Sequence, residues 1–236
     1  MTSSTPRRGP RAAAAFFGPL STVRYTVNGV SFDMVRVPPG RFVDSEGETR
    51  RELLVSRPFE LGVAPVTQAL WRAVMGASPS GFRGEDRPVE QVSWNEVQQL
   101  MAALAGRGLP GFRLPTEVEW AWAARCGVPT RWAGGDRTKA VAVVSSSQTS
   151  AVASLLGSAV GAFDPSGNVL EWAGDRYEQV PLAGVDGQGP ASRSNRVFRG
   201  GSWYSVPRYA RVAGRDYAAP GLRGDYLGVR LLRTAP

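Results

Sequence analysis

Two motifs, Arg199-Gly200-Gly201-Ser202-Trp203 and Leu227-Gly228-Val229-Arg230, enclose a segment with an unusual composition. Four of the six tyrosines in the 236-residue chain lie in this segment, which runs from Tyr204 to Tyr226. Tyrosine gives a large amphipathic contact area at a low cost in rotamer entropy, and together with Ser, Gly, Asp and Arg it is typical of an adaptable binding surface. The segment therefore has the composition of a paratope.

A tyrosine-rich core strand is the alternative interpretation, because aromatic residues are common in strands. The segment also carries six charged residues, which cannot easily be buried without partners. We therefore predict one exposed face on which tyrosines are anchors and Arg and Asp are specificity contacts for an unidentified protein or other macromolecular ligand. The residues predicted to form this face are Tyr204, Ser205, Val206, Arg208, Tyr209, Arg211, Asp216, Tyr217, Ala219, Gly221, Arg223, Asp225 and Tyr226.

The composition, with 42% hydrophobic residues, permits a sizeable core. We expect a flexible arm over residues 1–20 and a single domain over residues 21–236. The net charge of +8 comes almost entirely from arginine, since Lys139 is the only lysine, and this bias is as typical of a GC-rich or thermophilic source as of a function. No basic stripe with interleaved aromatics follows Arg7-Arg8-Gly9-Pro10-Arg11, so we do not expect nucleic-acid binding.

The absence of histidine removes many enzyme classes. It excludes Ser-His-Asp triads, Cys-His dyads, facial-triad iron sites and ordinary catalytic zinc sites. Cys126 is the only cysteine, so it cannot form an intrachain disulfide, and we expect it to pack as a small hydrophobe. The apolar run Ala12–Phe17 is too short for a convincing signal peptide or a membrane span, which favours a cytoplasmic location.

Local signals predict short strands followed by capped helices. Asn28-Gly29 predicts a hairpin, and residues 52–61 read as a further extended segment. Thr67 is a candidate cap for a helix that Gly76 ends. Capping boxes at 93–96 and 116–119 begin two further helices, the second ending at Gly127.

The second half of the chain has weaker signals. Residues 134–160 are rich in Gly, Ser, Thr, Ala and Val without a clean period, which predicts long loops with at most one short strand. Residues 166–172 predict a tight turn that enters a buried strand. We therefore expect an α+β domain rich in ordered loops.

Seven landmarks, taken in order, resemble the formylglycine-generating-enzyme (sulfatase-modifying factor) family, and the match runs from about residue 30 to 233. The resemblance implies a C-type-lectin-like fold of the formylglycine-generating type, loop-rich with little regular secondary structure, whose C-terminal strand folds back near the N-terminal one. The landmarks are residues 32–40, 65–67, 88–94, 113–120, 167–172, 199–203 and 228–230.

The sulfatase-modifying oxidases of this family hold copper with two cysteines in the segment that follows Gly-Gly-Ser-Trp. This chain has Tyr204, Ser205 and Tyr209 there and no cysteine, and it also lacks the histidines of the related iron-dependent sulfoxide synthases. We therefore expect a non-enzymatic protein. An oxidase with altered chemistry and a structural or regulatory domain of a larger assembly are the alternatives.

The tail instead looks like the variable region of a diversity-generating-retroelement target protein, in which an error-prone reverse transcriptase replaces adenines. The resemblance implies that 199–236 is the variable region, with 199–203 and 228–230 as its fixed scaffold. Adenine substitution in an asparagine-type codon never gives Lys, Glu, Gln, Trp or Met. None of these five occurs from Tyr204 to Pro236.

Three further expectations concern the landmarks. The turn with Asn168 and Glu171 often holds calcium in this family, and a hard oxygen site fits that ion; the alternative is that Glu171 pairs with an arginine. Arg199 and Arg230 suit rigid ion pairs within the scaffold better than ligand contacts. The tryptophans are expected to fill the core and pin loops rather than form a ligand cage; they are Trp94, Trp120, Trp122, Trp172 and Trp203.

Overall fold

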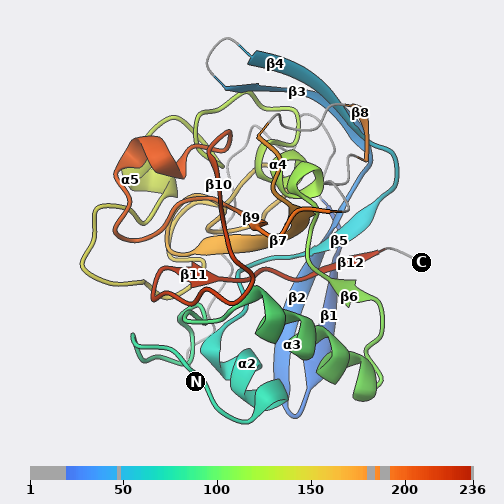
Figure 1. Cartoon of the computed structure of the whole chain (residues 1–236), viewed down its shortest axis with the longest axis vertical. Coiled ribbons are helices and arrows are strands. Elements are labelled where there is room, and N and C mark those ends of the chain that lie inside the picture. Colours follow the sequence, from blue (N-terminus) through green and yellow to red (C-terminus); the bar gives the residue numbers. More distant parts are fainter. Residues whose placement is uncertain (1–19, 47–48, 180–183, 187–191, 235–236) are drawn as a thin grey trace.

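The computed structural model describes residues 20–46, 49–179, 184–186 and 192–234. Within these residues, short strands form three sheets, and a few short helices pack against them (Figure 1). Helices α2 (Gln68–Met75) and α3 (Trp94–Gly106) lie side by side at one end of the molecule. The antiparallel pair of β3 (Gly40–Glu46) and β4 (Thr49–Val55) lies at the opposite end. The predicted α+β, loop-rich architecture is confirmed. The predicted N-terminal arm lies outside the described residues except for Leu20.

The first sheet has the order β1-β2-β5-β12-β6. Asn28 and Gly29 connect its first two strands with φ values of 46° and 79°, so the predicted hairpin is confirmed. The C-terminal strand pairs with β5 and β6, and it thus returns to the sheet that the N-terminal strands begin. The strands are β1 (Thr22–Val27), β2 (Val30–Val37), β5 (Phe59–Gly62), β6 (Phe112–Arg113) and β12 (Leu232–Thr234).

Two smaller sheets complete the strands. One has the order β10-β9-β7-β11, and it contains β7 (Leu170–Arg176), β9 (Arg196–Arg199), β10 (Arg215–Ala218) and β11 (Leu227–Gly228). The other has the order β3-β4-β8, and it contains β3 (Gly40–Glu46), β4 (Thr49–Val55) and β8 (Gly184–Val185). The extended segment predicted over 52–61 therefore divides into parts of β4 and β5, which lie in different sheets.

The helices begin where the capping residues predicted. Thr67 accepts a hydrogen bond from Leu70 N at the start of α2 (Gln68–Met75), and Gly76 ends that helix. Both capping boxes form, at the starts of α3 (Trp94–Gly106) and α4 (Glu117–Arg125). Within the described ranges, no helix combines the length and the apolar character that crossing a bilayer requires.

The region 134–160 differs from the prediction, because it contains a short helix, α5 (Thr138–Val141), and no named strand. No side chain caps this helix, so the local sequence carries no start signal. A contact from a distant loop holds it instead, since Leu156 N donates to the carbonyl of Ala140 at 3.0 Å.

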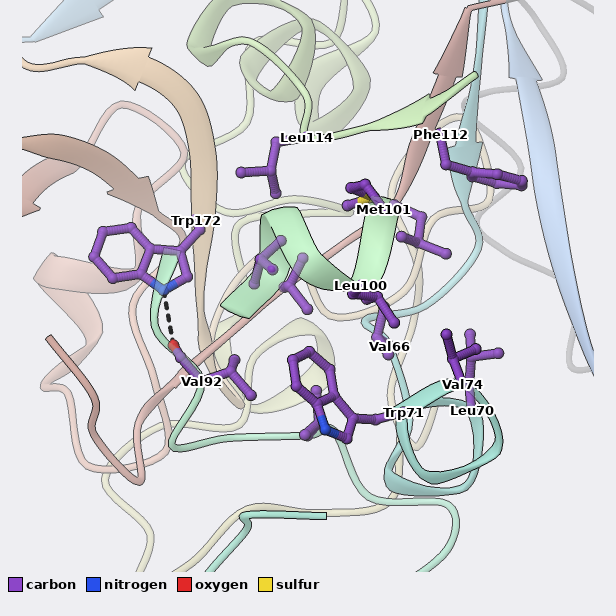
Figure 2. Close-up of a cluster of buried hydrophobic side chains, with 14 of the residues drawn as sticks. Val66, Leu70, Trp71, Val74, Val92, Leu100, Met101, Phe112, Leu114 and Trp172 are labelled. Carbon is purple, nitrogen blue, oxygen red and sulfur yellow. Dashed lines mark hydrogen bonds between the residues drawn. The ribbon is translucent and has the colours of Figure 1, made fainter. Parts of the chain in front are cut away.

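The core is divided into two clusters of buried side chains. Figure 2 shows part of the first, where the Trp172 indole nitrogen donates to the carbonyl of Val92 at 2.9 Å. Trp120 and Trp122 lie in the second cluster with Cys126, whose burial raises the pKa of the thiol to about 12. Cys126 thus packs as a hydrophobe, as predicted.

Candidate ligand-binding surface

Arg199 anchors the start of the 204–226 segment. Its side chain is 1% exposed, and it donates to Glu117 Oε1 and to the carbonyl of Val212 at 2.5 and 2.7 Å. Glu117 also accepts two hydrogen bonds from Arg215, at 2.7 and 2.9 Å. These arginines keep the pKa of Glu117 below its usual range although burial opposes this. The predicted structural ion pair of Arg199 is confirmed.

Arg230 anchors the other end, and it is fully buried. Its guanidinium binds both carboxylate oxygens of Glu171 at 2.7–3.1 Å and donates to the carbonyls of Gly62 and Phe163. Trp120 Nε1 donates to the same carboxylate at 2.7 Å. A charge-assisted, bidentate pair of this kind is rigid, which suits a scaffold position.

These contacts decide between the two predictions made for Glu171. Both oxygens of Glu171 are occupied by Arg230 and Trp120, so the alternative prediction of an arginine pair is the one that the structure shows. The Asn168 side chain is directed to the backbone of Ser150, from whose N–H it accepts and to whose carbonyl it donates. No group of three or more acidic, Cys or His side chains suitable for a metal occurs in the described ranges.

Glycines allow the chain to turn sharply after Arg199. Gly200 and Gly201 have φ values of 99° and 69°, a region that side chains rarely adopt. A Cβ atom on Gly201 would lie 2.7 Å from the Cα of Ala210, so the two backbone segments touch here. This contact fixes the 3₁₀ turn η1 (Pro207–Ala210) against the anchor motif.

Trp203 pins the loop that follows. Its indole nitrogen donates to the carbonyl of Asp225 at 3.0 Å, and its ring packs edge-to-face against Phe82 at 5.2 Å between centroids. Trp94 acts similarly by donating to the carbonyl of Ala173 at 3.0 Å. The predicted role of the tryptophans in the core and in pinning loops is confirmed for these two and for the buried Trp120, Trp122 and Trp172.

The predicted face is largely exposed. Tyr204, Tyr209 and Tyr217 are 51%, 59% and 44% exposed. Asp225 and Tyr226 are half-buried, and Tyr226 packs against the first core cluster. The other exposed members are Val206, Arg208, Arg211, Asp216, Ala219, Gly221 and Arg223.

Ser205 is the exception among the predicted residues, because its side chain is buried although it lies on this face. It is 8% exposed, and its hydroxyl accepts a hydrogen bond from Ser202 N at 3.0 Å. The side chain thereby closes a local turn. The three-residue spacing of the two serines is the signal that could have identified this role.

A cavity of about 750 Å³ opens on this face. It brings together predicted residues from η1, from the loop before it and from β10, while Leu170 and Phe198 supply part of its floor. The predicted residues that line it are Tyr204, Ser205, Val206, Arg208, Tyr209, Arg211 and Asp216; those that do not are Tyr217, Ala219, Gly221, Arg223, Asp225 and Tyr226.

Contacts between aromatic rings order the tyrosines. Tyr204 packs edge-to-face against Tyr226 at 5.3 Å, and Tyr217 stacks on Tyr177 at 3.8 Å between centroids. Partial burial, and then the neighbouring Tyr226 and the charge of Asp216, raise the pKa of Tyr204, so this hydroxyl stays protonated. Tyr177 lies outside the segment that the sequence singled out.

Ion pairs and cation–π contacts position the charged side chains of the face. Arg208 donates to the hydroxyl of Tyr209 at 2.6 Å and its guanidinium lies 4.6 Å from the centroid of that ring. Arg223 pairs with Glu96 of α3 at 2.8 Å. Glu96, like Tyr177, could not be assigned to this face from the sequence, because it lies 127 residues from its partner.

The two-cysteine copper site of the family's oxidases does not fit this chain. The one cysteine, Cys126, is buried in the second core cluster, away from the cavity. A thiolate pair therefore cannot form at the surface after Trp203.

These elements define a C-type-lectin-like scaffold of the formylglycine-generating type that carries a tyrosine-rich loop surface between two buried ion pairs. The chain belongs to the family described as the sulfatase-modifying factor enzyme 1-like domain, which matches residues 25–235.

Curated relatives include an enzyme and an inactive homologue. The chain is 32% identical over 194 residues to the formylglycine-generating enzyme of Streptomyces coelicolor, covering 72% of this chain and 60% of that protein. It is 33% identical over 200 residues to the inactive Cα-formylglycine-generating enzyme 2 of Mus musculus, covering 72% and 57%. The chain thus spans less than two thirds of either relative, and family membership alone does not assign an activity.

Among solved structures, the chain is similar to Treponema denticola variable protein 1. The two share 29% sequence identity with a TM-score of 0.83, and the match covers 91% of this chain and 99% of that one. The resemblance of the tail to variable proteins therefore has a counterpart in the fold of nearly the whole chain.

Proposed function

We propose that this protein is a non-enzymatic ligand-binding protein that presents a diversified surface on a fixed scaffold, as a variable protein of a diversity-generating retroelement. One observation carries the proposal. Of the seven large hydrophobic side chains that are exposed among the described residues, five belong to the segment 204–222. They are Tyr204, Val206, Tyr209, Tyr217 and Leu222.

Three of these side chains, Tyr204, Val206 and Tyr209, line the same cavity of about 750 Å³. Exposed large apolar side chains gathered in one patch are typical of interaction sites, whereas scattered ones need no explanation. The tyrosines here are also restrained by contacts with Tyr177, Tyr226 and Arg208, which lowers the entropy lost on binding. A macromolecular ligand would thus meet partly preorganised anchors.

The anchors support the idea that the surface can vary. The scaffold ends of the segment are fixed by Arg199–Glu117 and Arg230–Glu171, whose side chains are buried. Ten of the thirteen predicted contact side chains are exposed. Changes among them would therefore leave the fold intact, as a diversified surface requires.

The test is the DNA that surrounds the gene. We expect a reverse-transcriptase gene and a near-copy of the codons for residues 199–236 that differs from them at adenines. Differences should fall at codons of exposed residues and spare those of Arg199, Trp203 and Arg230. A chromosome without such a copy, or a copy whose differences fall equally on buried positions, would refute the proposal.

A further inference from the structure

A second cleft, of about 770 Å³, is separate from the 204–226 surface. It lies where the start of α3, the strand β6 and the end of β7 meet, and no residue from 197 to 226 lines it. Its volume is in the range of small-ligand sites, which is roughly 300–1,000 Å³. The cleft is therefore not part of the 204–226 surface.

The walls of this cleft provide apolar surface. Phe59 and Leu114 are buried beneath it, and the half-buried Trp94 forms one side. Ligand sites typically combine such apolar walls with a small number of polar groups that fix orientation. The cleft is thus suited to the apolar body of an organic ligand.

The charges of the cleft leave a small positive surplus. Among the residues that the structure describes, four arginines and three carboxylates line it: Arg57, Arg113, Arg176, Arg196, Glu119, Asp175 and Asp186. Arg113 and Glu119 neutralise each other through two hydrogen bonds of 2.7 Å. The Asp175 carboxylate accepts from Glu117 N at the start of α4, and that of Asp186 accepts from Ser56 N. The surplus is one positive charge.

Two contacts hold the guanidinium of Arg196 in place in the cleft. Its guanidinium lies 3.8 Å from the centroid of the Trp94 ring, and its Nη1 donates to the carbonyl of Gly174 at 2.9 Å. Its Nε is buried and has no hydrogen-bond partner within the described part of the chain. Burial, and then the charge of Arg176, lower the pKa of Arg196, while the charge of Asp175 opposes this shift.

We propose that this cleft binds an organic ligand with one carboxylate on an apolar body, with Arg196 as the main contact for the carboxylate. A planar guanidinium held flat on an indole is preorganised for carboxylate recognition. A single carboxylate matches the surplus charge, whereas a phosphate dianion would exceed it and face Asp175 and Asp186. The carboxylate belongs either to a small molecule or to the C-terminus of a peptide.

Calorimetry with matched probes tests the chemistry and its source. The probes are N-acetyl-phenylalanine, a hexapeptide that ends in phenylalanine, the amidated form of each, and inorganic phosphate. We expect at least one free carboxylate to bind at least ten-fold more tightly than its amide, and the stronger of the two identifies the source. Equal binding of acid and amide, tighter binding of phosphate, or no saturable binding by any probe would overturn the proposal.

Variants locate the binding. Arg196→Gln should weaken the carboxylate at least ten-fold, and Arg57→Gln, which changes an exposed side chain, should weaken it several-fold. Arg24→Gln is the matched control, since Arg24 pairs with Asp33 outside the cleft. Tyr204→Ser should leave this binding unchanged, which separates it from the variable surface. Unchanged affinity in folded Arg196→Gln and Arg57→Gln would refute the assignment.

Discussion

Replacing Trp172 with alanine should destabilise the protein far more than replacing Tyr209 with serine. Trp172 is fully buried, packs edge-to-face on Phe198 at 5.4 Å and donates to the carbonyl of Val92. Loss of a buried tryptophan costs roughly 3–5 kcal/mol. The orphaned carbonyl places this case toward the upper end of that range, because an unsatisfied buried acceptor is itself costly.

Tyr209, by contrast, is 59% exposed. Its contacts are with the exposed Arg208, so Tyr209→Ser should change the free energy of unfolding by no more than about 0.5 kcal/mol. Tyr204→Ser should cost somewhat more, up to about 1.5 kcal/mol, because its ring packs against Trp203 and Tyr226. The segment should therefore tolerate change where the scaffold does not.

Thermal melts followed by circular dichroism measure this difference. For a chain of this length, each kcal/mol shifts the Tm by about 2–4 °C, so Trp172→Ala should lower it by roughly 6–20 °C and Tyr209→Ser by about 2 °C or less. Trp172→Phe is the matched control, since it keeps an aromatic ring and removes the indole N–H; it should lie between the two. A Tm for Tyr209→Ser as low as that of Trp172→Ala would show that the segment belongs to the core, and it would refute the proposal of an exposed, diversified surface.

Three further predictions concern stability and chemistry. Burial, with a smaller contribution from Asp225, raises the pKa of Glu90 to about 7. Protonated Glu90 therefore stabilises the folded protein fully below the pKa of the unfolded state, and this stabilisation is lost as the pH rises through 7. The free energy of unfolding of Glu90→Gln should therefore rise relative to that of the wild type by up to about 3 kcal/mol between pH 5 and 8, at roughly 1.4 kcal/mol per pKa unit. Urea melts that show the same difference at every pH would contradict this. Gly201→Ala, whose Cβ would clash with Ala210, should cost more than about 1 kcal/mol, while Gly221→Ala, with open space around it, should be neutral in the same melts. Finally, copper should not support oxygen consumption with a cysteine-containing sulfatase peptide, and turnover above a metal-stripped control would disprove this.

Features that depend on neighbouring residues could be predicted from the sequence. Both capping boxes and the hairpin at Asn28-Gly29 form as expected, because the side chains that determine them lie within three residues of the groups they bind. The helix α5 could not be predicted, since it has no cap and is held by the backbone of Leu156.

The composition of the segment predicted the exposed face, but the sequence did not show which residues outside the segment contact it. Tyrosine and charge density indicated the segment, and ten of its thirteen predicted residues are exposed. Tyr177, Glu96 and Glu117 were missed because their partners Tyr217, Arg223 and Arg199 lie between 40 and 127 residues away. The burial of Ser205 was not predicted, because composition does not show that its hydroxyl bonds to Ser202.

The ion pairs at Arg199 and Arg230 explain how the ends of the segment can stay fixed while its exposed side chains differ. Arg230 is bound by Glu171 and by the carbonyls of Gly62 and Phe163, all outside the segment. Arg199 is bound by Glu117 and by the carbonyl of Val212, and Arg215 of the segment shares the Glu117 carboxylate. Neither anchor therefore uses a side chain of the thirteen predicted for the exposed face. Removing one partner of such a pair costs about 3–5 kcal/mol, whereas exposed changes cost about 0.5 kcal/mol. Selection for folding therefore acts on the anchors and hardly on the face. A segment anchored at both ends in this way can carry different exposed side chains at little cost in stability, and what it binds is then set by the side chains that it presents.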